Sequence, residues 1–546
     1  MRQQHKVVVW VASFACCVAS VVAGASESVR FDMDPVPSLL ATPDESSVLV
    51  SGWPVAPGTR SDVVLTRHDI YAPNAVVYRV EGERRVEVRR CRLHFLWGNA
   101  HDESGTPVLV VVDPDTATLH GFSGNPDNAT EVRRALDPDG GYLLFSEAEL
   151  TELASGPRPW VCTDAEGDER VSADSTGTAE LLRPDAISTL HRATLAVDTD
   201  NELLVQKFSN DTTAATDYIA TLFALMSVIY ERDLLVRTLE GTTLLRVSTT
   251  ADPYLQSGTG NADSAKLTEF ENWWIANQSG VTRALAMMLS GKQASPNASS
   301  GIASVNALCN TSRGYSFSQV FKYSGSTAAS DVQVVAHEVG HNFGSRHTHC
   351  YLTPTPIDMC YAGEGGCYSG ATSCPAPTTI NGVTNVRGTL MSYCHLLGGC
   401  SASKVFHPRT VAVIAPLVDS KVGVCVFPAG TPQEASPAGD MKAERGSGTT
   451  VNVTYSQACG ASGHTVYTGA LDTLSASGIV WSQRFCSLGS SGSLFFNPGA
   501  ANAYFVVVGN SGTTEGSYGH TSTGERPAAG AGGACSYTRT LGGTCP

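Results

Sequence analysis

The sequence predicts a mixed α/β domain, with helices packed on a mixed, twisted sheet, between a β-rich N-terminal region and a C-terminal β-sandwich. Three observations predict this architecture. The 546 residues exceed one ordinary hydrophobic core. Strand-like and helix-like patterns follow one another in the central part, and short β-type runs between turn residues fill both flanks. We expect five segments, with the bounds 1–25, 26–185, 186–428, 429–450 and 451–546.

The composition is that of a folded chain with an acidic balance. Hydrophobic residues make up 42% of the chain and charged residues 16%, and the formal net charge is −15. Such a chain is repelled by the phosphate backbone, so we expect no nucleic-acid partner. Solubility alone accounts for the negative charge.

The first 25 residues have the pattern of a secretory signal peptide. Arg2 and Lys6 precede an apolar run over 7–22, and Ala23-Gly24-Ala25 is a small-residue cleavage site. The alternative is an uncleaved anchor. No later segment has eighteen uninterrupted apolar residues. We therefore expect a secreted, extracellular protein without a membrane anchor.

Cysteines and glycosylation sequons agree with a secretory route. Beyond residue 25 there are fourteen cysteines: two before residue 186, eight from Cys309 to Cys425, and four from Cys459 onwards. An even number in each block is expected of domains that oxidise separately. The sequons of the predicted glycoprotein begin at Asn128, Asn210, Asn277, Asn297, Asn310 and Asn452.

The region 26–185 reads as a β-rich domain without chemistry of its own. Its β-type runs lie at 47–50, 76–80, 85–88, 108–112 and 142–145. Its two cysteines, Cys91 and Cys162, leave two alternatives open: a disulfide between them, or a Cys162 thiolate that binds a metal. A small, polar segment at 171–185 is the predicted linker.

The central region 186–428 combines strands with two predicted helices around its metal motif. Apolar residues at helical spacing predict a long helix over 215–233 and a closing helix within 405–424. A loop-like segment rich in Cys, Gly and Pro covers 350–400. Strands are expected at 194–197, 244–247, 284–289 and 301–308.

The rest of the chain is organised around the run 337–347, His-Glu-Val-Gly-His-Asn-Phe-Gly-Ser-Arg-His. Ser330 and Gln333 have the form of a capping box, which predicts a helix that begins near Asp331. On this helix His337 and His341 lie one turn apart and share a face. Two imidazoles on one face can hold one zinc ion.

The remaining residues of the motif complete a catalytic site. Glu338 can reach a water bound to the same metal. Gly344 supplies the positive φ at which the chain turns sharply, and His347 returns as the third ligand. Three protein ligands and an open position indicate a catalytic zinc site.

The run 337–347 resembles the zinc-binding consensus of the metzincin metallopeptidases, and Thr389-Leu390-Met391-Ser392-Tyr393 resembles their Met-turn. The cysteine-rich segment after His347, and Gly301-Ile302-Ala303 before Cys309, are most similar to the adamalysin, or reprolysin-like, group. The chain departs from that group at Thr348, where adamalysins usually carry aspartate. Its Met-Ser-Tyr run is closer to serralysins and astacins.

The resemblance implies a secreted zinc endopeptidase made as a zymogen, with 26–185 as a propeptide-like domain. Glu338 would be the general base, and Met391 would shape the floor below the metal. Tyr393 would reach the metal or the developing oxyanion, or else would only pack there. Cys162 would be the zymogen latch unless it pairs with Cys91, and Cys309 would pair with Cys425.

The resemblance also implies the substrate class and the edge at which it binds. Extended polypeptide substrates would add to an edge strand that contains Gly301, Ile302 and Ala303. His349 and His395 are expected to lie outside the ligand set, either beside it or exposed. Zinc is the predicted cofactor; calcium is compatible with such a fold, but no motif points to it.

Two other functions stay open. One is a catalytically silent adhesion or matrix protein on a metzincin scaffold, and the other is a zinc hydrolase of a different substrate class. Glu338 and the three histidines are all present, which favours the peptidase. Residues 451–546 loosely resemble the sandwich modules appended to secreted peptidases, and contact with a matrix or cell surface is their expected role.

Overall fold

The computed structural model describes residues 28–539 with gaps. The gaps of five residues or more are 101–105, 125–129, 135–140, 147–160, 166–189, 256–260, 293–298, 321–326, 429–434, 436–440 and 473–478. The expected signal peptide (1–25), the linker at 171–185, part of the linker at 429–450, and the sequons at Asn128 and Asn297 lie outside the described residues.

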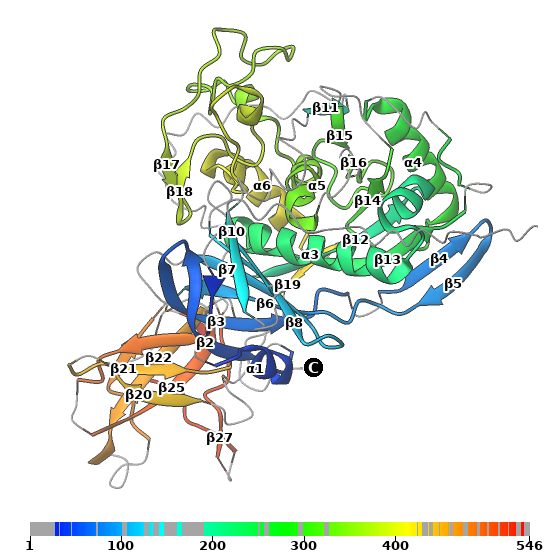
Figure 1. The fold of residues 1–546 in the computed structure, drawn as a ribbon. Coiled ribbons are helices and arrows are strands. Elements are labelled where there is room, and N and C mark those ends of the chain that lie inside the picture. The colour runs from blue at the N-terminus through cyan, green and yellow to red at the C-terminus, as the bar shows by residue number, and fades with distance from the viewer. Residues whose placement is uncertain are drawn as a thin grey trace, which may run out of the picture.

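The fold is mixed α/β and mostly sheet (Figure 1). The N-terminal sheet is antiparallel, with the strand order β1-β10-β9-β8-β7-β6-β3-β2. One of its faces packs with the short helix α1 (Val36–Ala41) around the buried Trp53. Its strands are β1 (Ser28–Val29), β2 (Ser47–Ala56), β3 (Thr59–His68), β6 (His94–Ala100), β7 (Pro107–Asp113), β8 (Thr118–Ser123), β9 (Thr130–Arg134) and β10 (Tyr142–Ser146).

The second sheet is mixed and has the order β11-β15-β16-β14-β12-β13-β4-β5, with β19 paired to β12. Its strands β12, β13, β14 and β16 run parallel, whereas β15 is antiparallel to β16. Its strands are β4 (Val77–Glu81), β5 (Arg84–Val88), β11 (Val161–Ala165), β12 (His191–Thr199), β13 (Val236–Arg246), β14 (Leu285–Ser290), β15 (Ser299–Ser304), β16 (Tyr315–Gln319) and β19 (Val426–Pro428). The N-terminal region therefore supplies strands to both edges of this sheet.

Four helices cover the second sheet: α3 (Thr212–Leu234), α4 (Ser264–Asn277), α5 (Ala328–Asn342) and α6 (Pro408–Ser420). Apolar residues of α3, α5 and α6 share one hydrophobic cluster on one face, and α4 packs with another cluster on the opposite face. The Asp211 carboxylate caps α3 by accepting from the amides of Thr213 and Ala214. The predicted helix over 215–233 thus forms, whereas α4 is a helix that the sequence patterns did not predict.

α3 is also long and apolar enough to cross a membrane by length and composition. In the fold it lies between the two large sheets, where its residues are largely buried. Burial on several sides explains its apolar composition, since a helix that is hydrophobic all round is usually a core helix.

The segment after α5 is a disulfide-linked loop region with little regular structure. It contains the 3₁₀ turns Thr348–Cys350 and Cys394–Leu396 and the hairpin of β17 (Thr378–Ile380) and β18 (Val383–Val386). All eight cysteines from Cys309 to Cys425 are paired, and the expected Cys309–Cys425 bond forms. The other pairs are Cys350–Cys367, Cys360–Cys394 and Cys374–Cys400.

The C-terminal residues form small β-sheets that lie beside the N-terminal sheet in Figure 1. A Cβ on Gly492 would lie 2.5 Å from Oγ of Ser47 on β2, so the two regions are in contact. Cys486 pairs with Cys535. The strands are β20 (Lys442–Arg445), β21 (Val451–Thr454), β22 (Gly463–Ala470), β23 (Gln483–Phe485), β24 (Ser493–Phe496), β25 (Ala503–Asn510), β26 (Thr514–Glu515), β27 (His520–Thr521), β28 (Gly524–Glu525) and β29 (Thr538–Arg539).

Candidate metal centre

Helix α5 carries the histidine motif and begins earlier than the sequence predicts. Thr327 is the N-cap and forms the capping box with Ser330, so the predicted pairing of Ser330 with Gln333 is wrong. Ser330 occupies the third helical position, where its hydroxyl accepts from the Thr327 amide at 3.0 Å. At the other end, the Asn342 side chain donates to backbone carbonyls of β15 and β16. The helix is thereby held against the sheet edge that contains Gly301.

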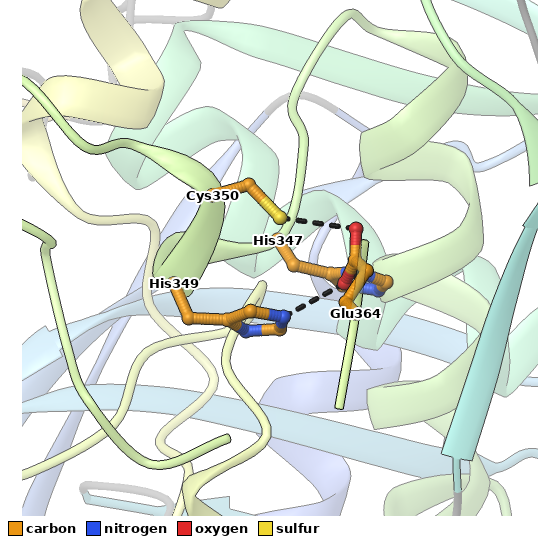
Figure 2. Close-up of side chains that lie close together, drawn as sticks. All are labelled: His347, His349, Cys350 and Glu364. Atoms are coloured by element: carbon orange, nitrogen blue, oxygen red, sulfur yellow. Dashed lines mark hydrogen bonds and ion pairs between the residues drawn. The ribbon is translucent and has the colours of Figure 1, made fainter. Parts of the chain in front are cut away.

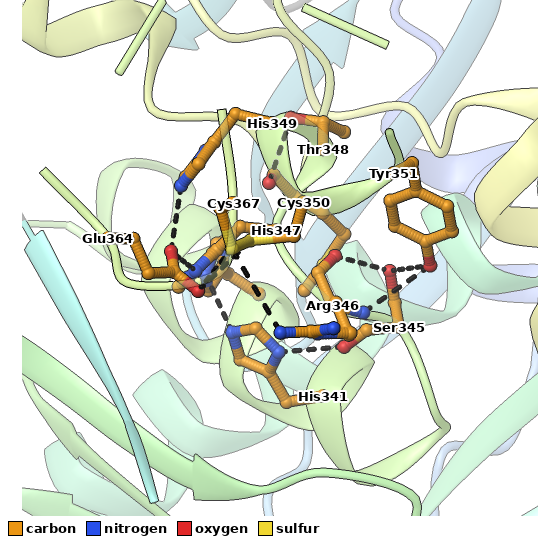
Figure 3. Close-up of polar contacts among 12 residues, drawn as sticks. His341, Ser345, Arg346, His347, Thr348, His349, Cys350, Tyr351, Glu364 and Cys367 are labelled. Atoms are coloured by element: carbon orange, nitrogen blue, oxygen red, sulfur yellow. Dashed lines mark hydrogen bonds and ion pairs between the residues drawn. A yellow bond between two sulfur atoms is a disulfide. The ribbon is translucent and has the colours of Figure 1, made fainter. Parts of the chain in front are cut away.

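The chain turns back directly after α5, as predicted. Gly344 has φ +104°, a conformation that L side chains rarely adopt. His341, on the last turn of α5, donates its Nδ1 proton to the carbonyl of Ser345 at 2.8 Å (Figure 3). The turn brings His347 back against the helix, with ring centroids 4.7 Å and 5.3 Å from those of His341 and His337.

His337, His341 and His347 come together as one group of possible metal ligands. The three residues are at most 1% exposed, and one nitrogen of each lies within 4.8 Å of the others. Nδ1 of His337 donates to the carbonyl of Leu390 at 2.8 Å. Because carbonyl oxygens only accept, His337 and His341 each carry their proton on Nδ1, and both Nε2 atoms hold a lone pair.

These lone pairs fit a zinc ion. Nε2 of His337 and Nε2 of His341 face each other at 3.1 Å. Two acceptors cannot form a hydrogen bond, whereas tetrahedral zinc with Zn–N bonds of about 2.0–2.1 Å separates its ligand nitrogens by roughly 3.3 Å. Burial, reinforced by the neighbouring imidazoles of His341 and His347, lowers the pKa of His337 well below its usual range. A neutral imidazole is the form that binds a metal.

Glu338, on α5, has its side chain against the strand that was predicted to bind substrate. It is fully buried, and a Cβ built on Gly301 would lie 1.9 Å from its Oε1 atom. Only a glycine therefore allows β15 to approach the carboxylate this closely. Gly301, Ile302 and Ala303 pair with β16 on one side. On the other side they pair with β11, in which Cys162, Thr163 and Asp164 are their register partners.

Met391 and Tyr393 lie against the histidine cluster. Met391 is fully buried, and a Cβ on Gly340 would lie 2.7 Å from its sulfur, so the turn packs directly on α5. Tyr393 is 2% exposed, and its ring centroid lies 4.3 Å from that of His347. Its ring also stacks on His337 at 6.2 Å. Both residues are thus placed below and beside the ligands.

Thr348 occupies the position where adamalysins usually carry aspartate, and it still ties the third ligand to the Met-turn. Its amide donates to the carbonyl of Met391 at 3.0 Å. Its hydroxyl donates to the carboxylate of Asp358, which is buried. Thr348 thus has a buried carboxylate, ten residues further on, as its hydrogen-bond partner.

Sequence reasoning missed one residue of the site, Glu364. Its carboxylate accepts from Nδ1 of His347 at 2.8 Å and from Nε2 of His349 at 2.7 Å (Figures 2 and 3). Burial would raise the pKa of Glu364, but the hydrogen bonds from His347 and His349 outweigh it and hold that pKa well below its usual range. The carboxylate is therefore an acceptor for both rings.

The fold brings Glu364 to the histidines through a disulfide. Cys350 follows the third ligand closely and is bonded to Cys367, which closes a loop that contains Glu364. The one sequence signal is a single acid in the glycine-rich run 363–366 between two cysteines. His349 is fully buried beside Glu364, with its ring stacked on His347 at 5.4 Å. His395 is half-buried and lies near Tyr393.

Cys91 and Cys162 do not form the disulfide that was one of the two alternatives. Cys91 carries a free thiol. Cys162 lies on β11 at the register position opposite Gly301, and its side chain lies outside the described part of the structure.

Comparison with known proteins finds a similarity over the part of the chain that contains the histidine cluster. Residues 189–393 match the model of metallo-peptidase family M12, reprolysin-like. No curated protein sequence matches the chain. One similar solved structure is a chaperone–substrate complex, at 11% identity and TM-score 0.24, over 53% of this chain and 37% of that chain. The protein thus spans little more than a third of that structure.

Two other solved structures are of OgpA from Akkermansia muciniphila. The wild-type protein has 11% identity and TM-score 0.21, over 60% of this chain and 94% of that chain. The catalytically inactive protein with an O-glycopeptide substrate has 9% identity and TM-score 0.20, over 60% and 93%. The family match over residues 189–393 supports a metzincin-like domain of the reprolysin group in this part of the chain, and the cluster of three histidines fits that group.

Proposed function

We propose that the protein is a secreted zinc endopeptidase, made as a zymogen, that cleaves extended segments of extracellular proteins. The observation that carries this proposal is the convergence of three buried imidazoles with Glu338 beside β15. Five disulfides among the described residues are typical of extracellular proteins.

His337, His341 and His347 would hold the zinc ion through Nε2 of His337 and His341 and a nitrogen of His347. Bound zinc would lower the pKa of a coordinated water and would polarise the scissile carbonyl. Glu338 takes the proton of the attacking water on its carboxylate and returns it to the departing amine. Glu338 is fully buried, and Gly301 leaves the space in which the carboxylate works.

Glu364 positions His347 in this mechanism. The backbone carbonyls of Leu390 and Ser345 hold His337 and His341, whereas a carboxylate holds the third ligand. A negative acceptor on Nδ1 increases the basicity of the imidazole and locks its orientation. His349 in turn holds Glu364 in place through a hydrogen bond to the same oxygen. Tyr393 packs on His337 and His347, and this contact supports a role for its hydroxyl in stabilising the developing oxyanion.

The zymogen part of the proposal rests on β11. Extended peptides add to an exposed sheet edge by backbone hydrogen bonds. In this structure β11 (Val161–Ala165) occupies that edge, because it pairs with β15. Cys162 is the register partner of Gly301, the residue that abuts Glu338. We infer that Cys162 supplies a thiolate to the metal, which keeps the uncleaved chain silent.

The decisive test is Glu338→Ala. The variant should bind one zinc ion like the wild type, because it keeps all three histidines, and should lose peptide hydrolysis by at least about 100-fold. Zinc content by atomic spectroscopy and cleavage of a peptide library measure the two properties. An active variant would refute the mechanism. A zinc-loaded, matured wild type that cleaves no peptide would favour the silent scaffold.

A further inference from the structure

The N-terminal sheet has two buried faces, and one of them belongs to the peptidase core. Side chains alternate along β6 and β7. Leu96, Val108, Val110 and Val112 pack within the N-terminal region. The alternate residues, which are 2–7% exposed, join the cluster that contains α3 and α5: they are Phe95, Trp97, Leu109 and Val111. If the N-terminal sheet separated from α3 and α5, a contiguous aromatic and aliphatic patch would be exposed to water. Folded monomers rarely carry such a patch.

α3 shows the same relationship from the other side. From Ala215 to Leu234 none of its residues is exposed. A helix that lies on the surface of a domain has a polar outer face, but α3 is covered by the second sheet on one side and by the N-terminal sheet on the other (Figure 1). The amino-acid composition of α3 is therefore that of a helix buried on both sides, by the second sheet and by the N-terminal sheet.

Backbone hydrogen bonds join the two parts as well. β4 extends the second sheet in parallel to β13, with Val77 opposite Thr243 and Val80 opposite Arg246. The amide of Glu240 donates to the carbonyl of Ile70, and the amide of Ala72 donates to the carbonyl of Glu240, both at 2.8 Å. Separation would uncover the edge of β13, and an unpaired edge strand favours aggregation.

Polar contacts complete the seam. The thiol of Cys91 lies beside the carboxylate of Asp217 on α3. The guanidinium of Arg237 lies 5.4 Å from the ring centroid of Trp97. Arg85 on β5 donates to the side chain of Gln278 at 3.2 Å. By comparison, β11 adds to β15 at a single edge over five residues.

We propose that the N-terminal sheet, with β4 and β5, is a permanent subunit of the peptidase domain, so that the mature enzyme is a two-chain complex. Cleavage between Ala165 and His191 would free β11 to leave the substrate edge while residues 28–146 stay bound to α3 and β13. The proposal concerns the fate of the propeptide-like region in the zymogen proposed above. Its test needs no peptidase activity, so the two can fail separately.

The experiment uses the full chain with Glu338→Ala, which removes self-cleavage, and a recognition sequence for a site-specific protease within 171–185. After complete cleavage, size-exclusion chromatography and native mass spectrometry at micromolar concentration should show both fragments in one complex. Elution of the fragments apart in native buffer would overturn the proposal, whether the remainder stays soluble or precipitates.

A matched pair of substitutions shows whether the seam carries the complex. Leu109→Ala removes a buried side chain from the face that contacts α3, and should weaken the association of the two fragments by roughly 30-fold or more. Leu49→Ala removes a side chain that is 44% exposed on β2 of the same sheet, and should leave the association unchanged. Equal effects of the two substitutions would contradict the assigned surface.

Discussion

His347 donates its Nδ1 proton to the carboxylate of Glu364 at 2.8 Å. The two residues are seventeen positions apart in the chain, and the Cys350–Cys367 disulfide closes the loop between them. Among the three candidate ligands, His347 has the charged acceptor, whereas His337 and His341 have backbone carbonyls. This difference makes Glu364 the most informative residue to change outside the ligands themselves.

Glu364→Ala should weaken zinc binding by about 10–100-fold, because residues that orient a ligand have effects of that size. Glu364→Gln keeps an oxygen acceptor but loses the charge. Its zinc affinity should lie between that of the alanine variant and that of the wild type. Competition with a chromophoric chelator measures the affinity without any substrate. Equal zinc affinity in all three proteins would remove Glu364 from the site.

Gly301→Ala should inactivate the enzyme without removing its metal. The added Cβ would lie 1.9 Å from Oε1 of Glu338, so the carboxylate has to move. A displacement of about 1 Å in a catalytic group can cost about 100-fold in rate, and we expect at least that loss in kcat with zinc retained. Gly280→Ala is the control, since a Cβ there meets nothing within 4 Å. Full activity in Gly301→Ala would place Glu338 elsewhere during catalysis.

Cys162→Ser should make the uncleaved precursor partly active, because serine is a much weaker zinc ligand than a thiolate. The structure removes the competing disulfide partner, since Cys91 carries a free thiol. Cys91→Ser is therefore the control and should leave the precursor silent. The assay is peptide cleavage by a precursor that is checked for an intact chain before and after the measurement. A silent Cys162→Ser precursor that is well folded would refute the latch.

Glu240→Gln should change how stability depends on pH. Burial raises the pKa of Glu240 from 4.5 to about 8, against the opposing effects of Thr243 and Arg90. A raised acid pKa means that the folded state holds a proton that the unfolded state has lost. The stabilisation from this group is therefore complete below pH 4.5 and is lost as the pH rises towards about 8.

The glutamine variant lacks this loss, so its Tm relative to that of the wild type should be higher at pH 8.5 than at pH 5. Differential scanning fluorimetry at the two pH values measures the difference. A constant gap between the two proteins would show that Glu240 is ionised throughout the range.

The C-terminal sheets should be dispensable for the chemistry. A chain that ends after Pro428 keeps β19, which pairs with β12, and keeps every residue of the metal centre. It should cleave short peptides at the wild-type rate, whereas cleavage of large or matrix-bound proteins should fall if 451–546 contacts them. Loss of short-peptide cleavage in a folded truncated protein would show that this region completes the site.

The sequence alone determined the parts that depend on neighbours along the chain. His337, Glu338 and His341 lie on one helix. The two histidines share a face of it because a spacing of four residues returns to the same face. Gly344 turns the chain because its position requires a positive φ. The long helix α3 follows from apolar residues at helical spacing, and the strands β12, β14 and β15 follow from short β-type runs bounded by turns.

Only the tertiary structure decided the relationships between distant segments. β-type runs at 76–80 and 85–88 were predicted as strands, but their place at the edge of the second sheet depends on β13, and strand patterns specify no partner. Glu364 reaches His347 through a disulfide whose pairing no spacing reveals. Apolar residues at helical spacing predicted α3 as a helix. Its cover by the N-terminal sheet depends on packing between segments more than a hundred residues apart, because the hydrophobic effect is non-directional and specifies no partner.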